Sequence, residues 1–438
     1  MLGNIEGVKS AAHTFNKHVD TKLKGVGWEI KSIFPTMYTY DNPENPALPA
    51  VLNLHVDDGV MHVPDSLKDL PERTRKGLSS TGPQGRVLKL DKISKKSLFL
   101  GRLREVRERA VMDISQGISK GFTKIVREVK ISAPEYIKSG IQKYCKPSLQ
   151  EQDIPYNSQR VIQGKKLGDR DQEEILKDKN ALKEFNYQSA IAYLLYLGLW
   201  IRPEILPIVQ ILQQFGQPHM TRRVHITAAK HIFGYLKKSP HKGRVYTNEI
   251  PEEDMNRFKC FTDANFNTTG DYSRAGYIFM LNGAVASCKT YRIKRQVMSS
   301  SEAELIGMAT AAIKSTTLSG VMLQFSNKPK DILYQPKQED PLQNIEEMKV
   351  YGDCKPAIQA AKSLNPGKMI TNIGHLDYRL YKIRELSKRG AVKFLHVYGE
   401  GNPADLMTKL VTPKKFHQFT DFILNTKADT GFASAIGN

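Results

Sequence analysis

In the second half of the chain, short apolar runs alternate with amphipathic stretches. Asn282-Gly283 tolerates the positive φ of a tight turn between two apolar runs. The pattern predicts strands over 258–265, 276–281, 284–290, 348–352 and 392–398, and helices over 300–323, 356–363, 376–388 and from Pro403 onward. This order, β-β-β-α-β-α-α-β-α, predicts an α/β domain over 257–425 with a mixed five-stranded sheet and flanking helices.

A helical block precedes this domain. Apolar residues at helical spacing predict helices over 187–201, 205–215 and 225–236. Arg202-Pro203 should end the first of them, because the residue before a proline is disfavoured in the helical conformation. We therefore expect a helical region over 181–250.

The first half of the chain shows weaker patterns. Apolar residues alternate over 51–63 on both sides of Asp58-Gly59, which predicts a hairpin with its turn there. Residues 65–130 are rich in Lys and Arg, so we expect irregular or helical surface structure, and Leu149 to Lys179 should be a linker or exposed loop. These patterns divide the remaining chain into 1–64, a basic region with a linker over 65–180, and a disordered tail over 426–438.

Charge changes this picture. The chain has 65 Lys and Arg against 45 Asp and Glu, a net charge of +20, and such an excess attracts polyanions. Nucleic acid is the partner this favours, although a merely basic protein has the same balance. The four scattered cysteines argue against a disulfide framework or a structural zinc.

Two further observations concern the compartment. The longest apolar run, 190–201, is too short to span a bilayer, and residues 1–24 lack the apolar stretch of a signal peptide. We expect no membrane partner, and a protein of the cytoplasm or the nucleus.

Four carboxylates lie where a metal-dependent nuclease would need them. Asp263 interrupts the first apolar strand, Glu304 lies in the first turns of the next helix, Asp353 ends a strand, and Asp405 follows Asn402-Pro403 at a predicted helix start. If the first and fourth strands are parallel neighbours, Asp263 and Asp353 meet at one sheet edge. Clustered carboxylates repel each other unless they bind cations, and hard oxygen ligands favour Mg²⁺ or Mn²⁺. A pair of such ions supports phosphodiester hydrolysis.

Each acid also has an ordinary interpretation. Glu302 and Glu304 suit the start of a helix, and Ser299 with Glu302 matches a capping box. Asp405 could serve a helix N-terminus in the same way, and Asp353 could form a turn. Asp263 is the exception, because a charge within an apolar strand is costly without a partner.

The acidic segments also carry a resemblance. They are Phe261-Thr262-Asp263-Ala264, Ser300-Ser301-Glu302-Ala303-Glu304-Leu305, Tyr351-Gly352-Asp353-Cys354, Asn402-Pro403-Ala404-Asp405-Leu406-Met407-Thr408-Lys409 and, without an expected ligand, His375-Leu376-Asp377-Tyr378-Arg379. Over about 170 residues these resemble the ribonuclease H motifs of Ty/copia-type retrotransposon Pol polyproteins. The resemblance implies a ribonuclease H-like fold with Asp263, Glu304, Asp353 and Asp405 as ligands of two Mg²⁺ ions. It implies the RNA strand of an RNA·DNA hybrid as substrate, with Glu304 rather than Glu302 as the ligand.

The resemblance extends upstream, where Tyr187-Gln188-Ser189-Ala190-Ile191 and Arg202-Pro203-Glu204-Ile205 are similar to the region after the polymerase palm. Val56-Asp57-Asp58 stands where that family has the paired aspartates of its reverse transcriptase, although a hairpin alone explains these residues equally well. A palm needs a third carboxylate on an earlier strand, and Gly7-Val8-Lys9-Ser10 resembles a segment downstream of it. We therefore expect a truncated palm over 1–64, a thumb or connection over 181–250, and no polymerase activity without other Pol segments.

Basic residues suggest how a substrate is held. Arg292, Lys294 and Arg295 precede the helix of Glu304 and are candidates for phosphate contacts. A second group could continue that track or form a solvated face: Arg222, Arg223, Lys230 and Lys237. Two alternatives to a hybrid-cleaving hydrolase stay open. One is an integrase-like DNA strand transferase using Asp263, Asp353 and Glu385, and the other is a non-catalytic remnant that only binds nucleic acid.

Overall fold

The structure is a computed structural model that describes residues 9–30, 37–45, 49–55, 58–79, 96–113, 122–157, 172–266, 273–294, 296–325, 347–362 and 377–427. The chain divides into two compact units. The first comprises Met1–Leu100 with Leu318–Ile345, and the second Gly101–Thr317 with Glu346–Asn438. Within the described residues, no helix is both long and apolar enough to cross a membrane.

The first unit contains an antiparallel sheet in the order β1-β2-β3-β4. Its core surrounds the buried Trp28, whose indole N–H donates to Thr74 Oγ1 at 2.9 Å. Its elements are α1 (Lys9–Val26), β1 (Glu29–Ile30), β2 (Met37–Tyr40), β3 (Ala50–His55), β4 (Asp58–His62), η1 (Asp65–Leu67), α2 (Leu70–Ser79) and β5 (Lys96–Phe99).

The predicted hairpin exists, but its turn is displaced. His55 lies opposite Asp58 in the register of β3 and β4. Asp58 and Gly59 therefore belong to the second strand, and the expected turn at these two residues is wrong. Asp57 and the side chain of Asp58 lie outside the described residues.

The second unit contains the predicted five-stranded mixed sheet, in the order β11-β10-β9-β12-β13. Strand β12 runs parallel to β9 and β13, and β10 runs antiparallel to β9 and β11. Asn282 (φ 46°) and Gly283 (φ 88°) form the tight turn that was predicted. The strands are β9 (Lys259–Asn265), β10 (Arg274–Leu281), β11 (Ala284–Arg292), β12 (Met348–Gly352) and β13 (Val392–His396).

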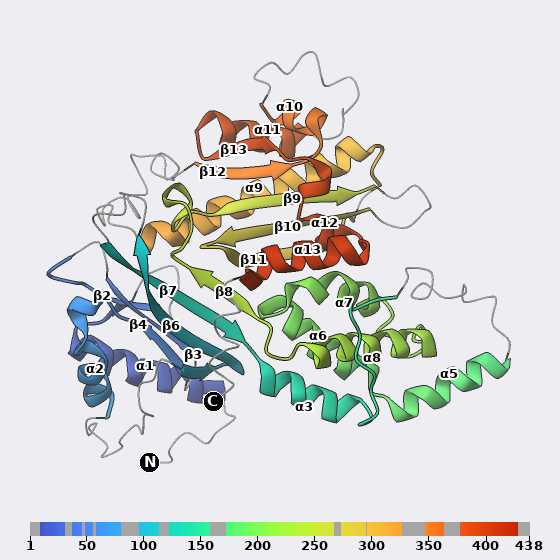
Figure 1. Ribbon diagram of the computed structural model, residues 1–438, viewed down its shortest axis with the longest axis horizontal. Coiled ribbons are helices and arrows are strands. Elements are labelled where there is room, and N and C mark those ends of the chain that lie inside the picture. Colours follow the sequence, from blue (N-terminus) through green and yellow to red (C-terminus); the bar gives the residue numbers. More distant parts are fainter. Residues whose placement is uncertain are drawn as a thin grey trace. The chain divides into compact units, whose positions relative to one another are not determined.

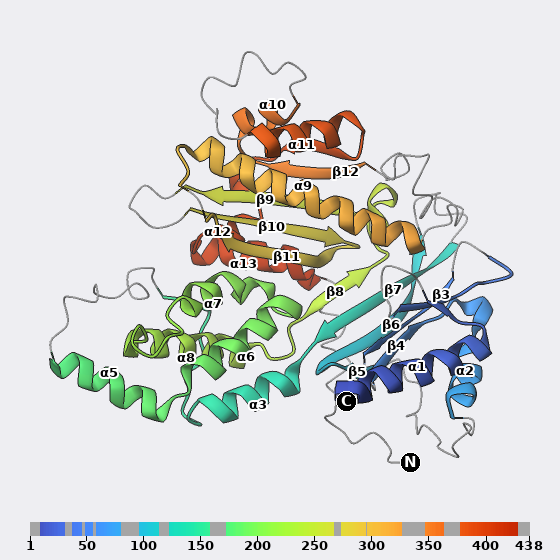
Figure 2. The same ribbon diagram turned by 180° about the vertical axis from the view of Figure 1, so that it is seen from behind.

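Helices cover both faces of this sheet. Figure 1 shows α12 (Asp405–Thr408) and α13 (Pro413–Leu424) on one face, and Figure 2 shows α9 (Ser300–Phe325) on the other. Helices α10 (Lys355–Lys362) and α11 (Asp377–Lys388) pack beside β13. The single helix expected from Pro403 is wrong, because Lys409 is extended (φ −143°, ψ 158°) and Pro413 begins a separate helix.

A second sheet of this unit pairs β6 (Arg102–Asp113), β7 (Phe122–Ser132) and β8 (Arg244–Thr247) in antiparallel order. The irregular or helical structure expected over 65–130 is therefore wrong for β6 and β7, and the expected loop to Lys179 is helical from Gln172 in α5 (Gln172–Glu184).

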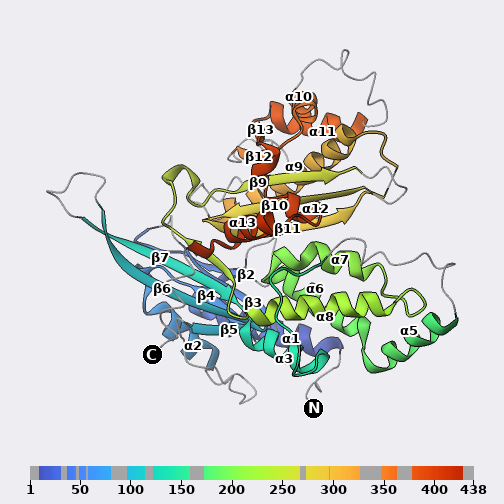
Figure 3. The same ribbon diagram turned by 45° about the vertical axis from the view of Figure 1, so that its right-hand side comes forward.

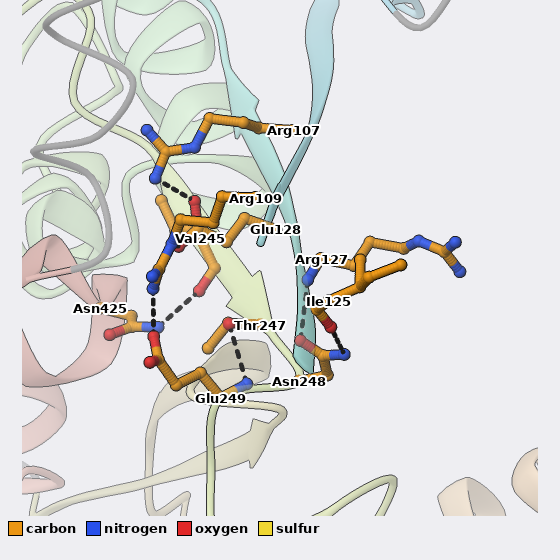
Figure 4. A network of polar contacts seen from close by, with 10 residues as sticks. All are labelled: Arg107, Arg109, Ile125, Arg127, Glu128, Val245, Thr247, Asn248, Glu249 and Asn425. Carbon is orange, nitrogen blue, oxygen red and sulfur yellow. Dashed lines mark hydrogen bonds and ion pairs between the residues drawn. The ribbon is translucent and has the colours of Figure 1, made fainter. Parts of the chain in front are cut away.

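Ion pairs connect neighbouring strands of this sheet. Arg107 lies 2.6 Å and Arg109 3.4 Å from the carboxylate of the buried Glu128. Figure 4 shows these side chains together. The side chain of Asn248 accepts from Arg127 N at 2.8 Å and donates to Ile125 O at 3.1 Å, which secures the chain after β8 to β7.

The helical block lies in the same unit, next to β11 and α13 (Figure 3). It consists of α3 (Pro134–Tyr144), α6 (Tyr187–Trp200), η3 (Pro203–Ile205), α7 (Leu206–Gln213) and α8 (Arg223–Lys238), which confirms the predicted helices within a few residues. Leu194, Leu212 and Phe233 of this block share one buried cluster with Val285 and Phe416.

Buried polar contacts reinforce this junction. The guanidinium of Arg244 on β8 donates to Leu199 O at 3.0 Å and to Val285 O at 3.4 Å. The hydroxyl of Tyr156 donates to Val411 O at 2.8 Å. The block and the five-stranded sheet therefore fold around one core.

This shared core predicts how the chain tolerates excision. A fragment of residues 257–438 loses the apolar partners of Val285 and Phe416, whereas a fragment of residues 101–438 keeps them. We expect the shorter fragment to unfold at a lower urea concentration, because large buried side chains left without partners cost several kcal/mol together. Urea titration followed by circular dichroism measures both midpoints. Equal midpoints would show that the five-stranded sheet is independent of the helices.

Candidate metal centre

Asp263 lies in β9 with only 1% of its surface exposed. It faces Gly276 of the neighbouring strand β10. A Cβ on Gly276 would collide with Met407 of α12. Glycine at this position therefore allows α12 to lie directly against the sheet beside Asp263.

Asp353 directly follows β12, the parallel neighbour of β9. The register places Tyr351 beside Phe261, so Asp353 and Asp263 each lie two residues further along adjacent strands. Parallel neighbours bring residues at equivalent positions to the same edge of a sheet. The condition set out from the sequence, that these two strands be adjacent and parallel, is met.

Asp405 comes from α12, which is fixed to β9 by two side chains. Asn402 Nδ2 donates to Thr262 O at 3.0 Å, and the Thr408 hydroxyl donates to Asp263 Oδ2. As a result, Asp263, Asp353 and Asp405 each offer a carboxylate oxygen within 4.8 Å of the others.

Glu304 reaches the same region from α9, on the opposite face. Its Oε1 accepts from Ala264 N at 3.0 Å, next to Asp263 in the chain. Its Oε2 is buried and has no hydrogen-bond partner among the described residues. Glu302 has a different role, since its Oε2 accepts from Met298 N at 2.7 Å while Ser299 Oγ accepts from its backbone N–H at 3.1 Å.

The protonation of these acids reflects burial and mutual repulsion. Burial raises the pKa of Asp263 to about 6, with Asp405 and Asp353 contributing and Lys409 opposing. Burial, Asp263 and Asp353 together raise the pKa of Glu304 to about 9. Burial also raises the pKa of Asp353, against the effect of Lys409. The centre therefore resists holding all of its negative charge.

Two lysines accompany the acids. Lys409 Nζ lies 2.9 Å from Asp405 Oδ1 and 3.7 Å from Asp263 Oδ2, and Lys415 Nζ lies 4.0 Å from Asp405 Oδ2. The acids hold the pKa of Lys409 above its ordinary value despite its partial desolvation. Sequence reasoning missed Thr408 and Lys409 as parts of the centre. Their spacing of three and four residues after Asp405 was the available signal.

The basic candidates named from the sequence have different surroundings. Arg292 and Lys294 are exposed. In the strand register, Arg292 of β11 lies opposite Arg274 of β10, which lies opposite Asn265 at the end of β9. Arg295 and His375 lie outside the described residues. The basic group of the helical block is engaged in contacts: Arg222 is buried, Arg223 lies 3.8 Å from Asp178, Lys230 lies over the Phe185 ring, and Lys237 donates to Leu149 O.

Glu385, the third acid of the strand-transferase alternative, is occupied on α11. Its carboxylate pairs with Lys382 at 3.0 Å and with Arg389 at 2.5 Å. It is absent from the described group of acids that converge on Asp263. The geometry thus gives that alternative no support.

Comparison with known proteins finds similarity to retrotransposon polyproteins. No protein-family profile matches the chain. The Pol polyprotein of the tobacco (Nicotiana tabacum) transposon TNT 1-94 is 25% identical over 55% of this chain and 16% of its own length. The truncated Ty1-A Gag-Pol polyprotein of Saccharomyces cerevisiae is 23% identical over 67% of this chain and 23% of its own length. The curated homologues are Ty1/copia-type Pol polyproteins. The chain spans less than a quarter of the length of these Pol relatives.

Solved structures similar to part of the chain are ribonuclease H domains. LC11-RNase H1, solved in complex with an RNA/DNA hybrid, is 14% identical, with a TM-score of 0.25, over 35% of this chain and 94% of its own. An N-terminal RNase H domain from Mycobacterium tuberculosis is 10% identical, with a TM-score of 0.24, over 40% of this chain and 98% of its own.

The donor set of the centre fits a hard divalent cation. Three carboxylates converge, and the buried Glu304 Oε2 has no hydrogen-bond partner in the part of the chain that the structure describes. An unpaired buried carboxylate oxygen is costly, and a cation would offset both that cost and the repulsion. Carboxylate oxygens without thiols or imidazoles suit Mg²⁺ or Mn²⁺.

The raised pKa of Asp263 predicts how the metal-free protein responds to pH. When a chelator removes metal ions, Asp263 keeps its proton in the folded state at pH values where the same aspartate in the unfolded chain, with a pKa of about 4, has lost it. The free energy of unfolding should therefore fall as pH rises from about 4 through about 6, the pKa of Asp263. Asp263→Asn should weaken this fall, so the variant gains stability relative to the wild type across that interval.

Urea denaturation at several pH values, with and without chelator, measures the effect. Adding Mg²⁺ above pH 7 should raise the free energy of unfolding of the wild type again, and should raise that of Asp263→Asn by less. Parallel pH profiles for the two proteins would mean that burial and the neighbouring acids do not raise the pKa of Asp263.

Proposed function

We propose that residues 257–425 form a metal-dependent nuclease that hydrolyses the RNA strand of RNA·DNA hybrids, within a fragment of a retrotransposon Pol polyprotein. The observation that carries this proposal is the convergence of Asp263, Asp353 and Asp405 within 4.8 Å. The Pol polyprotein homologues and the motif resemblance support the choice of substrate.

Asp263, Glu304, Asp353 and Asp405 would hold the metal, as a pair of Mg²⁺ or Mn²⁺ ions. Divalent ions of this kind lower the pKa of a bound water and stabilise charge on a leaving oxygen. The chain's own part is to keep the carboxylates in place through Ala264 N–H and the Thr408 hydroxyl.

Cationic side chains would bind the phosphates. Lys409 and Lys415 are partly exposed beside Asp405. Arg292 and Lys294 lie near the same end of the sheet, where β10 begins and β11 ends. Ammonium and guanidinium groups position a nucleic acid through its phosphates without reading its bases. In the same proposal, residues 181–250 correspond to a thumb or connection and residues 1–64 to part of a palm.

The test is cleavage of a labelled RNA·DNA hybrid by the full chain in Mg²⁺. We expect Asp263→Asn to lower the rate at least about 100-fold, because even indirect supports of a metal site cost 10–100-fold. Chelator should abolish cleavage. Glu385→Gln is the matched control, since this acid forms ion pairs with Lys382 on α11 and with Arg389 just after it, and it should keep the wild-type rate.

The alternatives give different results. Strand transfer on labelled duplex DNA that requires Glu385 would favour the integrase-like activity. A wild-type chain that binds the hybrid but cleaves nothing, and that behaves like Asp263→Asn, would identify a non-catalytic remnant and refute the proposal.

A further inference from the structure

An exposed pair of aromatic rings lies next to the acidic centre and has no part in the chemistry described so far. His396 ends β13, and Tyr398 follows two residues later. Their ring centroids are 5.4 Å apart with the planes at 81°, so His396 contacts Tyr398 edge-on. Tyr398 is 80% exposed. Tyr398 therefore presents a large aromatic ring to the solvent.

The backbone holds this pair against Asp353. Val397 N donates to Gly352 O at 2.9 Å, which joins the segment to the residue before Asp353. Gly401 N donates to Tyr398 O at 2.8 Å and closes the turn. A Cβ on Gly399 would lie only 3.3 Å from Asp353 Oδ2. Tyr398 therefore immediately precedes a residue in contact with a carboxylate of the centre.

The centre is asymmetric as a consequence. The aromatic pair borders Asp353, whereas the ammonium groups of Lys409 and Lys415 border Asp405. A nucleic acid strand has a similar asymmetry, with charged phosphates next to less polar sugar rings. Cations suit the phosphates, and an exposed ring suits the sugar of a neighbouring nucleotide.

We propose that Tyr398, supported by His396, is a positioning residue whose ring packs against a sugar of the hybrid next to the phosphate to be cleaved. The inference rests on the proposed function for its substrate. It adds a contact surface on the Asp353 side of the centre, and it assigns the ring rather than the hydroxyl as the group that binds.

Tyr398→Ala in the full chain is the first test. Stacking of a base on an aromatic ring is worth a factor of roughly ten or more in affinity, and we take the same scale for a ring that packs on a sugar. We expect KM for the hybrid to rise about tenfold or more, with kcat within about twofold, because the contact forms before the reaction and is retained during it. Tyr398→Phe keeps the ring and should stay within about twofold of the wild type.

Tyr381→Ala is the matched control, because Tyr381 is also an exposed tyrosine (71%) but lies on α11. It should leave both constants unchanged. The urea midpoint of Tyr398→Ala should equal that of the wild type, since the ring is exposed.

A binding measurement separates this inference from the proposed nuclease activity. Fluorescence anisotropy with a labelled hybrid is measured on Asp263→Asn, alone and combined with Tyr398→Ala. We expect Kd to rise about tenfold or more in the double variant. That result, together with a wild-type chain that cleaves no hybrid, would support the contact and refute the nuclease. Cleavage by the wild type with KM and Kd unaffected by Tyr398→Ala would overturn the contact and leave the nuclease. Equal losses in Tyr398→Phe and Tyr398→Ala would also overturn it, because the hydroxyl would then be the binding group.

Discussion

Repulsion among buried carboxylates is the constraint on which the second unit depends. Asp263 and Glu304 approach each other from a strand and a helix, and burial with like charge raises the pKa of both. Neutral donors, Ala264 N–H and the Thr408 hydroxyl, offset part of this cost. The ammonium group of Lys409 offsets a further part of the cost. Such a centre persists only where the surrounding elements leave the acids no room to separate.

The close approach of α9 and α12 to β9 provides that confinement. Gly276 admits α12 on one face, and a Cβ on Gly307 of α9 would lie 3.2 Å from Thr262 Oγ1 on the other. Asn402 then fixes the start of the α12 segment to the backbone of β9. Helices thus enclose Thr262 and Asp263 from both faces of the sheet. The packing of these helices, and not the rotamers of the acids alone, fixes where the carboxylates lie.

The sequence predicted the parts of this arrangement that rest on local patterns. The five strands are apolar and bounded by turn residues, so their ranges agree within about two residues. It did not predict β6 and β7, because alternating Arg and Glu lack an apolar period, and their pairing, such as Arg107 with Glu128, joins distant residues. It also missed Lys409, whose role depends on the helix ending there and turning the side chain back to Asp263.

The core that the five-stranded sheet shares with the helical block contributes stability that the acidic centre takes away. Acids with raised pKa values reduce the free energy of unfolding at any pH at which they must ionise in the folded state without a cation. Apolar burial has to offset that loss, and a small sheet domain offers limited apolar area. Leu212 and Phe233 of the helices, packed in one cluster with Val285 and Phe416, enlarge the buried area beyond what the sheet has alone. Arg244 adds hydrogen bonds across the same junction. The helices are therefore part of what allows four acids to remain together before any cation binds.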